Sequence, residues 1–106
     1  VARLASERRE VTGIDAPAER AGVLGAFFRG GRLESMPATR SKRLVVLDHL
    51  AQDFEPGRRY QEREVNEVLS RFHDDYATLR RYLVDEEFLT RERGEYWRSG
   101  GSVEVD

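Results

Sequence analysis

Apolar residues recur at helical spacing in three segments of the chain. The clearest pattern lies in residues 61–72, where Val65, Val68, Leu69 and Phe72 follow the i, i+3, i+4, i+7 spacing of an amphipathic helix. Residues 42–53 and 75–87 have stripes of the same period. Those two stripes consist of Leu44, Leu47, Leu50, Ala51 and Phe54, and of Tyr76, Leu79 and Leu83. We expect one core to contain Val65, Leu69, Phe72, Leu79, Leu83, Leu47 and Phe54.

An earlier helix is expected over residues 16–29. Asp15 suits its N-cap, and Pro17 suits its first turn. Its apolar face would consist of Leu24, Phe27 and Phe28. The glycine pair that follows is typical of a helix end, and residues 32–36 are expected to form a short strand.

The remaining segments favour extended structure. Residues 58–60 are expected to form a short strand before the helix of residues 61–72. A tight turn at residues 73–74 then separates that helix from the next, for which Asp74 or Asp75 is the expected cap. Residues 88–91 and 95–98 predict a β-hairpin around the dipeptide Arg93-Gly94.

This order of elements is typical of a winged helix. The expected fold class is α+β, mainly α: a winged helix-turn-helix with an N-terminal helix and a short-strand extension. A chain of 106 residues suits one domain. We therefore expect a flexible or helical lead-in at residues 1–15, a winged-helix-like domain at 16–98 and a disordered tail at 99–106.

Composition narrows the possible classes of protein. There are no cysteines, so disulfides and thiolate metal sites are excluded. No apolar run approaches the roughly 20 residues that span a bilayer, and no secretory signal is recognisable. The expected location is the cytoplasm, without membrane contact.

The charge is divided unevenly along the chain. The net charge is −2, which argues against a protein built mainly to bind phosphate backbones. Residues 1–43 hold nine basic and five acidic residues, whereas residues 44–106 hold nine basic and fifteen acidic. The densest basic cluster consists of Arg40, Lys42 and Arg43, and a solvated surface is the simplest interpretation of it.

A set of spaced residues resembles a known bacterial family. The set contains Phe54, Gly57, Tyr60, Glu64, Val65, Asn66, Asp75, Leu79, Arg80, Arg81, Tyr96, Trp97 and Arg98, and is preceded by GRLESMPA at residues 31–38. The pattern is similar to domain of unknown function 2087 over roughly residues 22–98, with Gln61 standing where a capping Thr is commoner. Members of that family stand alone or follow a metalloregulator-type helix-turn-helix domain. The resemblance therefore implies transcriptional regulation by association, and no biochemical activity.

The helix of residues 75–87 is the first candidate for DNA contact. With its stripe turned inward, Arg81 points outward with Thr78 nearby, and this face would enter the major groove. Five acidic residues surround the helix and oppose this interpretation: Asp74, Asp75, Asp85, Glu86 and Glu87. Arg80 flanks the buried face, and we expect it to pair with Glu64 or Glu67.

The hairpin is the second candidate. Arg91 and Arg93 on one side, with Arg98 on the returning strand, form a basic wing that suits phosphate contact. An equally good interpretation is that these arginines keep an edge strand soluble. Of Tyr96 and Trp97, at least one must face inward. The cluster Arg40, Lys42 and Arg43 is the reserve DNA surface.

Two further classes of function were weighed. His49 and His73 have no recognised metal spacing, so no metal, cofactor or enzyme activity is expected. An interaction or dimerisation module stays open beside the DNA-binding domain, with a homodimer or a regulator as partner. That alternative depends on the acidic balance after residue 43 and on apolar residues left over for a partner, namely Val23, Val45, Val46 and Tyr82.

Overall fold

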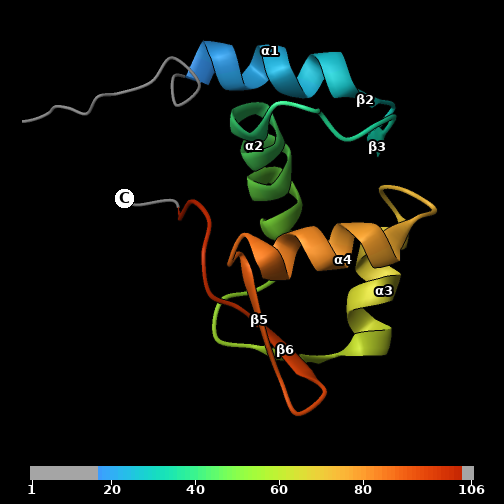
Figure 1. Cartoon of the computed structure of the whole chain (residues 1–106), viewed down its shortest axis with the longest axis vertical. Helices are drawn as coiled ribbons and strands as arrows, with labels where there is room; N and C mark the ends of the chain where they lie inside the picture. Colours follow the sequence, from blue (N-terminus) through green and yellow to red (C-terminus); the bar gives the residue numbers. More distant parts are fainter. Residues whose placement is uncertain (1–16, 104–106) are drawn as a thin grey trace, which may run out of the picture.

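A computed structural model describes residues 17–103, and Figure 1 shows its α+β architecture. The helices are α1 (Pro17–Phe27), α2 (Arg40–Ala51), α3 (Glu62–Ser70) and α4 (Tyr76–Asp85). The strands are β2 (Phe28–Arg29), β3 (Arg32–Leu33), β4 (Arg59–Gln61), β5 (Leu89–Glu92) and β6 (Glu95–Arg98). The strands of this part of the chain form two small antiparallel sheets, β2-β3 and β4-β6-β5.

The three-stranded sheet brings β4 against the returning strand of the hairpin. Tyr60 of β4 lies opposite Tyr96 of β6, and Arg91 of β5 lies on the other side of Tyr96. The hairpin turns through Arg93 and Gly94, whose φ angles are 53° and 81°. Two consecutive positive φ angles suit the right-handed twist of a two-residue hairpin loop. The predicted hairpin and its turn are therefore confirmed.

The three predicted stripes meet in one core, except for Leu44, which is half-buried and not one of the core residues. Its buried members include Leu47, Phe54, Val65, Leu69, Leu79 and Leu83, and Phe72 packs against it while partly exposed. The stripe of α4 is wrong at its first position, because Tyr76 is 38% exposed. Tyr76 is the first residue of the helix, and fewer neighbouring residues cover a side chain at a helix end than in its middle.

The N-terminal helix is shorter than predicted. It ends at Phe27, and Phe28 pairs with Leu33 across a turn formed by Gly30 and Gly31. These glycines have φ angles of 59° and 82°, so they make a hairpin turn rather than a helix end. The predicted strand at residues 32–36 is reduced to its first two residues, which are the ones that pair with β2 across this turn.

The apolar residues assigned to a partner lie mostly inside the domain. Val45 and Val46 are 2% and 0% exposed, and Val23 is 8% exposed. Tyr82 is half-buried and lies under the guanidinium of Arg43, 5.3 Å from the ring centre. The expectation that these residues remain free for a partner is therefore wrong, because α2 is covered on both sides, by α1 and by the helices below it (Figure 1).

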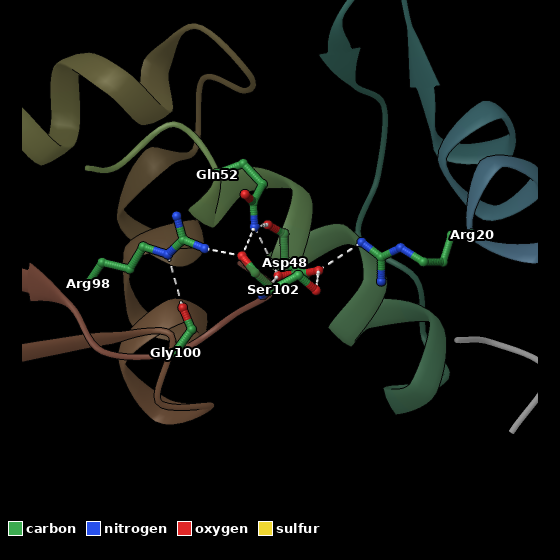
Figure 2. Close-up of polar contacts among 6 residues, drawn as sticks. All are labelled: Arg20, Asp48, Gln52, Arg98, Gly100 and Ser102. Atoms are coloured by element: carbon green, nitrogen blue, oxygen red, sulfur yellow. Dashed lines mark hydrogen bonds and ion pairs between the residues drawn. The ribbon is translucent and has the colours of Figure 1, made fainter. Parts of the chain in front are cut away.

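The segment after β6 is attached to the domain. The side chain of Asp48 in α2 accepts hydrogen bonds from the backbone N–H and the hydroxyl of Ser102, both at 2.6 Å. Arg20 of α1 donates to the same carboxylate at 2.8 Å (Figure 2). Ser102, in the predicted disordered tail, is thus held against α2 by these contacts. Residues 1–16 and 104–106, with the predicted lead-in, lie outside the described residues.

Candidate nucleic-acid interface

An open groove of about 610 Å³ lies between α4 and the three-stranded sheet. It contains two of the predicted DNA-binding arginines, Arg81 from α4 and Arg91 from β5. The other lining residues are Glu62, Ala77, Thr78, Arg80, Val84, Asp85 and Tyr96. The fold thus brings the outward face of α4 and one edge of the hairpin to a common surface.

Arg81 and Arg91 are the exposed basic groups of this groove. Neither forms a salt bridge within residues 17–103. The guanidinium of Arg91 lies 5.9 Å from the centre of the Tyr96 ring, which is the range of a weak cation–π contact. Both charges are consequently available to an anion that enters the groove.

Thr78 is tied to the beginning of α4. Asp75 is the N-cap, and its carboxylate accepts a hydrogen bond from the Thr78 hydroxyl at 2.8 Å and from the Thr78 backbone N–H at 3.4 Å. This cap satisfies a backbone donor that the helix leaves free. The hydroxyl oxygen of Thr78 still has lone pairs for a donor from a ligand.

Arg80 has a supporting role in the groove. Its side chain is 21% exposed, it donates a short hydrogen bond to Oδ1 of Asn66, and it lies 3.9 Å from Oε2 of Glu62. The predicted partners, Glu64 and Glu67, are wrong. Glu64 instead accepts a hydrogen bond of 2.9 Å from the backbone N–H of Gln61, which caps α3.

Glu62 is an acidic residue of the groove, and each of its carboxylate oxygens has a partner. Oε1 of Glu62 accepts a hydrogen bond of 3.0 Å from the hydroxyl of Tyr96, and its other oxygen faces Arg80. Burial, followed by the hydrogen bond to Glu62, raises the pKa of Tyr96 above its ordinary value. The Tyr96 hydroxyl and the Arg80 guanidinium offset part of the charge of Glu62, which therefore repels an approaching anion less than a free carboxylate would.

Most of the acidic residues around α4 also have partners. Asp74 pairs with Arg32 at 2.9 Å, and Glu86 pairs with Arg40 at 2.7 Å. Asp75 is the N-cap described above. The hydrogen bond from Arg40 lowers the pKa of Glu86. Of the five acids that argued against DNA contact in the sequence, three are thus engaged within the domain.

Residues 32–98 match the protein family described as "Uncharacterized protein conserved in bacteria (DUF2087)". The chain belongs to this family. The matched segment begins at β3 and ends with β6, so it includes every residue of the groove. No curated protein and no solved structure matches the chain.

Several residues of the DUF2087 pattern stabilise the fold. The rings of Phe54 and Tyr60 meet edge to face at 5.2 Å, and the Tyr60 hydroxyl accepts a hydrogen bond of 2.8 Å from the backbone N–H of Glu55. Gly57 has a φ of 85°, which disfavours any other residue. Asn66 holds Arg80, as described above. Much of the DUF2087 pattern therefore consists of residues that stabilise the sheet and the groove.

The structure separates the other predicted DNA-binding residues from the groove. Arg93 is exposed at the tip of the hairpin. Arg98 is half-buried and donates to the carbonyls of Phe54 at 3.3 Å and Gly100 at 3.1 Å, and to that of Ser102. Arg98 thus faces the attached C-terminal segment, as Figure 2 shows.

The reserve cluster is also divided. Arg40 binds Glu86 through two nitrogens, and Arg43 donates to the carbonyl of Ala38 at 3.0 Å. Lys42 is exposed and lines a separate groove beside α1. The three residues do not form a common basic surface, because two of them hold the segment before α2 and the end of α4 in place.

The two histidines have local partners. His49 lies between the rings of Phe28 and Phe72, with centroid distances of 4.9 and 6.3 Å. Nδ1 of His73 accepts a hydrogen bond of 2.9 Å from the backbone N–H of Asp75. Within residues 17–103, no group of three or more His, Cys, Asp or Glu side chains is placed to hold a metal ion. In the same part of the chain, no helix has the length and apolar character to cross a membrane.

Proposed function

We propose that this domain is a winged helix that binds double-stranded DNA in bacterial transcription control, with α4 in the major groove and the hairpin β5–β6 against the phosphate backbone. The order α2, β4, α3, α4, β5, β6 and the sheet order β4-β6-β5 support this assignment. In such an arrangement the second helix of the helix-turn-helix pair is the one that reads DNA. The proposal assigns no catalytic step, metal or cofactor to the domain.

The observation that carries the proposal is the convergence of Arg81 and Arg91 in one open groove. They come from different elements, both are exposed, and neither is engaged in an ion pair within the described chain. Unengaged arginines suit phosphate oxygens and guanine edges, since a guanidinium donates two parallel hydrogen bonds. Arg93 lies at the hairpin tip, outside the groove, and we propose it as a separate phosphate contact of the hairpin.

The engaged acids explain how an acidic chain presents such a surface. A net charge of −2 disfavours DNA only if its acids face the duplex. Around α4, Asp74, Asp75 and Glu86 are held by Arg32, by the helix terminus and by Arg40. Asp85 is the acid of α4 that still lines the groove. We therefore expect modest affinity with a clear dependence on salt.

The test is a fluorescence anisotropy titration of the full chain against a labelled random duplex at low salt. Wild-type protein should bind, and the double variant Arg81→Ala, Arg91→Ala should lose most of that affinity. Arg29→Ala is the matched control, because Arg29 is exposed, pairs with Glu34 and lies at the other end of the molecule (Figure 1). Absence of wild-type binding at low salt, or equal losses in the double variant and the control, contradicts the proposal.

A further inference from the structure

The outward side of α1 differs from the rest of the surface. Residues 21–28 contain no charged side chain, although 36% of the chain is charged. One side of α1 faces α2, where Val23 is buried and Arg20 binds Asp48 at 2.8 Å. The other side carries Ala18, Ala21, Gly22, Gly25 and Ala26, all exposed. A surface helix normally places polar residues there.

A largely apolar groove of about 430 Å³ runs along this helix. Ala18, Gly22 and Ala26 line it together with Val23 and Phe27 of α1 and Lys42 of α2, so the groove lies where α1 meets α2. These three small residues are spaced four apart, so they form one row on the helix surface, into which a second helix packs closely. A Cβ on Gly22 would meet no atom within 4 Å, so packing within residues 17–103 does not require glycine there.

Two opposite charges border the groove. Glu19 belongs to α1 and Lys42 to α2, and both are exposed. Neither forms a salt bridge with another residue of the described range. A two-fold axis places each residue of a contact opposite its counterpart on the second copy. A two-fold contact along this groove can therefore bring the acid of each copy to the base of the other.

We infer that this groove is a homodimer interface, in which two α1 helices pack across a two-fold axis and Glu19 pairs with Lys42 of the partner subunit. The ion pair between Arg20 and Asp48 and the burial of Val23 fix α1 on α2, so the surface is held ready before association. Preorganisation of this kind lowers the entropic cost of binding.

The position of α1 keeps this inference separate from the proposed DNA contact. α1 lies at the end of the molecule opposite the hairpin β5–β6 (Figure 1), so a dimer leaves the groove beside α4 open. It also precedes residues 32–98, which match the family. Most of the proposed dimer surface therefore lies before the matched segment, and Lys42 is its contribution from within that segment.

The first experiment measures self-association of the full chain by sedimentation velocity over a range of protein concentrations. We expect a reversible monomer–dimer equilibrium with a dissociation constant on the order of micromolar, since two short helices bury a small interface. Ala26→Glu places a charge in the groove and should weaken the dimer by about tenfold or more. Ala77→Glu is the matched control, because Ala77 is an exposed helical alanine in α4.

The second experiment exchanges the charges. Glu19→Lys and Lys42→Glu should each weaken self-association, while an equimolar mixture of the two variants should form a heterodimer in which both pairs attract. Rescue in a mixture cannot come from a contact within one chain, and thermal melts establish that each variant is folded.

Three results would overturn the inference. A wild-type chain that stays monomeric at every concentration would mean that residues 1–16 or an unlike protein covers the groove. A dimer that Ala26→Glu leaves intact, or weakens no more than Ala77→Glu, would lie elsewhere on the surface. A mixture without rescue would remove the pairing of Glu19 with Lys42.

Discussion

The carboxylate of Asp48 accepts a hydrogen bond of 2.6 Å from the hydroxyl of Ser102, although 54 positions separate the two residues. The same carboxylate binds Arg20 at 2.8 Å and the side-chain amide of Gln52 at 3.2 Å (Figure 2). Asp48 is only 5% exposed, and a buried carboxylate is costly unless charged or polar partners surround it. One acid therefore holds α1, α2 and the C-terminal segment together.

The first prediction concerns the strength of this attachment. Asp48→Ala should lower the free energy of unfolding by about 3 kcal/mol, because it leaves Arg20 without its partner. Ser102→Ala should cost about 1–2 kcal/mol, since it removes one hydrogen bond to a charged group. Urea denaturation measures both changes. Variants as stable as the wild type would show that the contacts among these residues contribute nothing to folding.

The second prediction concerns acid stability. Burial alone would raise the pKa of Asp48, but the hydrogen bonds from Ser102 and the charge of Arg20 outweigh it and lower the pKa below the ordinary value of 3.8. The unfolded chain then binds a proton at higher pH than the folded chain does. The stabilisation is complete above the ordinary value and is lost as the pH falls through the folded value.

Denaturation of Asp48→Asn beside the wild type checks this sign. The difference in unfolding free energy between them should shrink as the pH falls from neutral toward about 3. A difference that stays constant across this range would mean that Asp48 does not titrate with folding. Glu64 and Glu86 also have lowered pKa values and are present in both proteins. The wild type and the variant should therefore both still lose stability in acid.

The sequence does contain an indication of the role of Asp48, but the helical periodicity of apolar residues does not reveal it. Residues 44–51 read LVVLDHLA, which is apolar on nearly every side. Such a helix is buried all round, and an acid within it must find partners. The helical period predicts a one-sided stripe there, so Val45 and Val46 are assigned to a partner surface and Asp48 is not singled out. The partners Arg20 and Ser102 are distant in sequence and not predictable from it.

The position of a groove residue was predictable where the geometry of a single element determines the direction of its side chain. Arg81 is exposed as the helical rotation of 100° per residue requires. The register of the hairpin decides the rest, because it places Arg91 opposite Tyr96 and Arg98 opposite Leu89. Arg91 and Arg98 both lie in the hairpin, yet one reaches the groove and the other holds the chain after β6.

The third prediction tests the shared core. Leu69 is fully buried in the shared core. Leu69→Ala should destabilise the domain by about 2–5 kcal/mol, the usual cost of removing a buried leucine side chain and leaving a cavity. A thermal melt should show a clear decrease in Tm. Val103→Ala is the control, because Val103 is 67% exposed and its truncation should have little effect.

The fourth prediction separates two neighbouring arginines. Arg80→Ala should lower the free energy of unfolding by about 1–2 kcal/mol, since it leaves Oδ1 of Asn66 without its donor and removes the cation that faces Glu62. Arg81→Ala should change it by less than about 0.5 kcal/mol, as exposed substitutions usually do. Urea denaturation of both variants makes the comparison within one helix. Equal losses would show that Arg81 also supports the fold and is not free for a ligand.

The fifth prediction distinguishes what each arginine contacts, provided that the domain binds DNA. Each phosphate contact that is lost should reduce the slope of log affinity against log salt by about one unit. We expect this for Arg91→Ala and Arg93→Ala, because β5 packs against α4, which the proposal places in the major groove, and the hairpin turn continues from β5. Arg81→Ala should instead change the preference between duplex sequences by about 1–3 kcal/mol, since Arg81 is the outward arginine of α4. Anisotropy titrations at several salt concentrations with two duplexes measure both quantities. A uniform loss of slope for all three variants would place Arg81 on the backbone and leave base reading to another residue of α4.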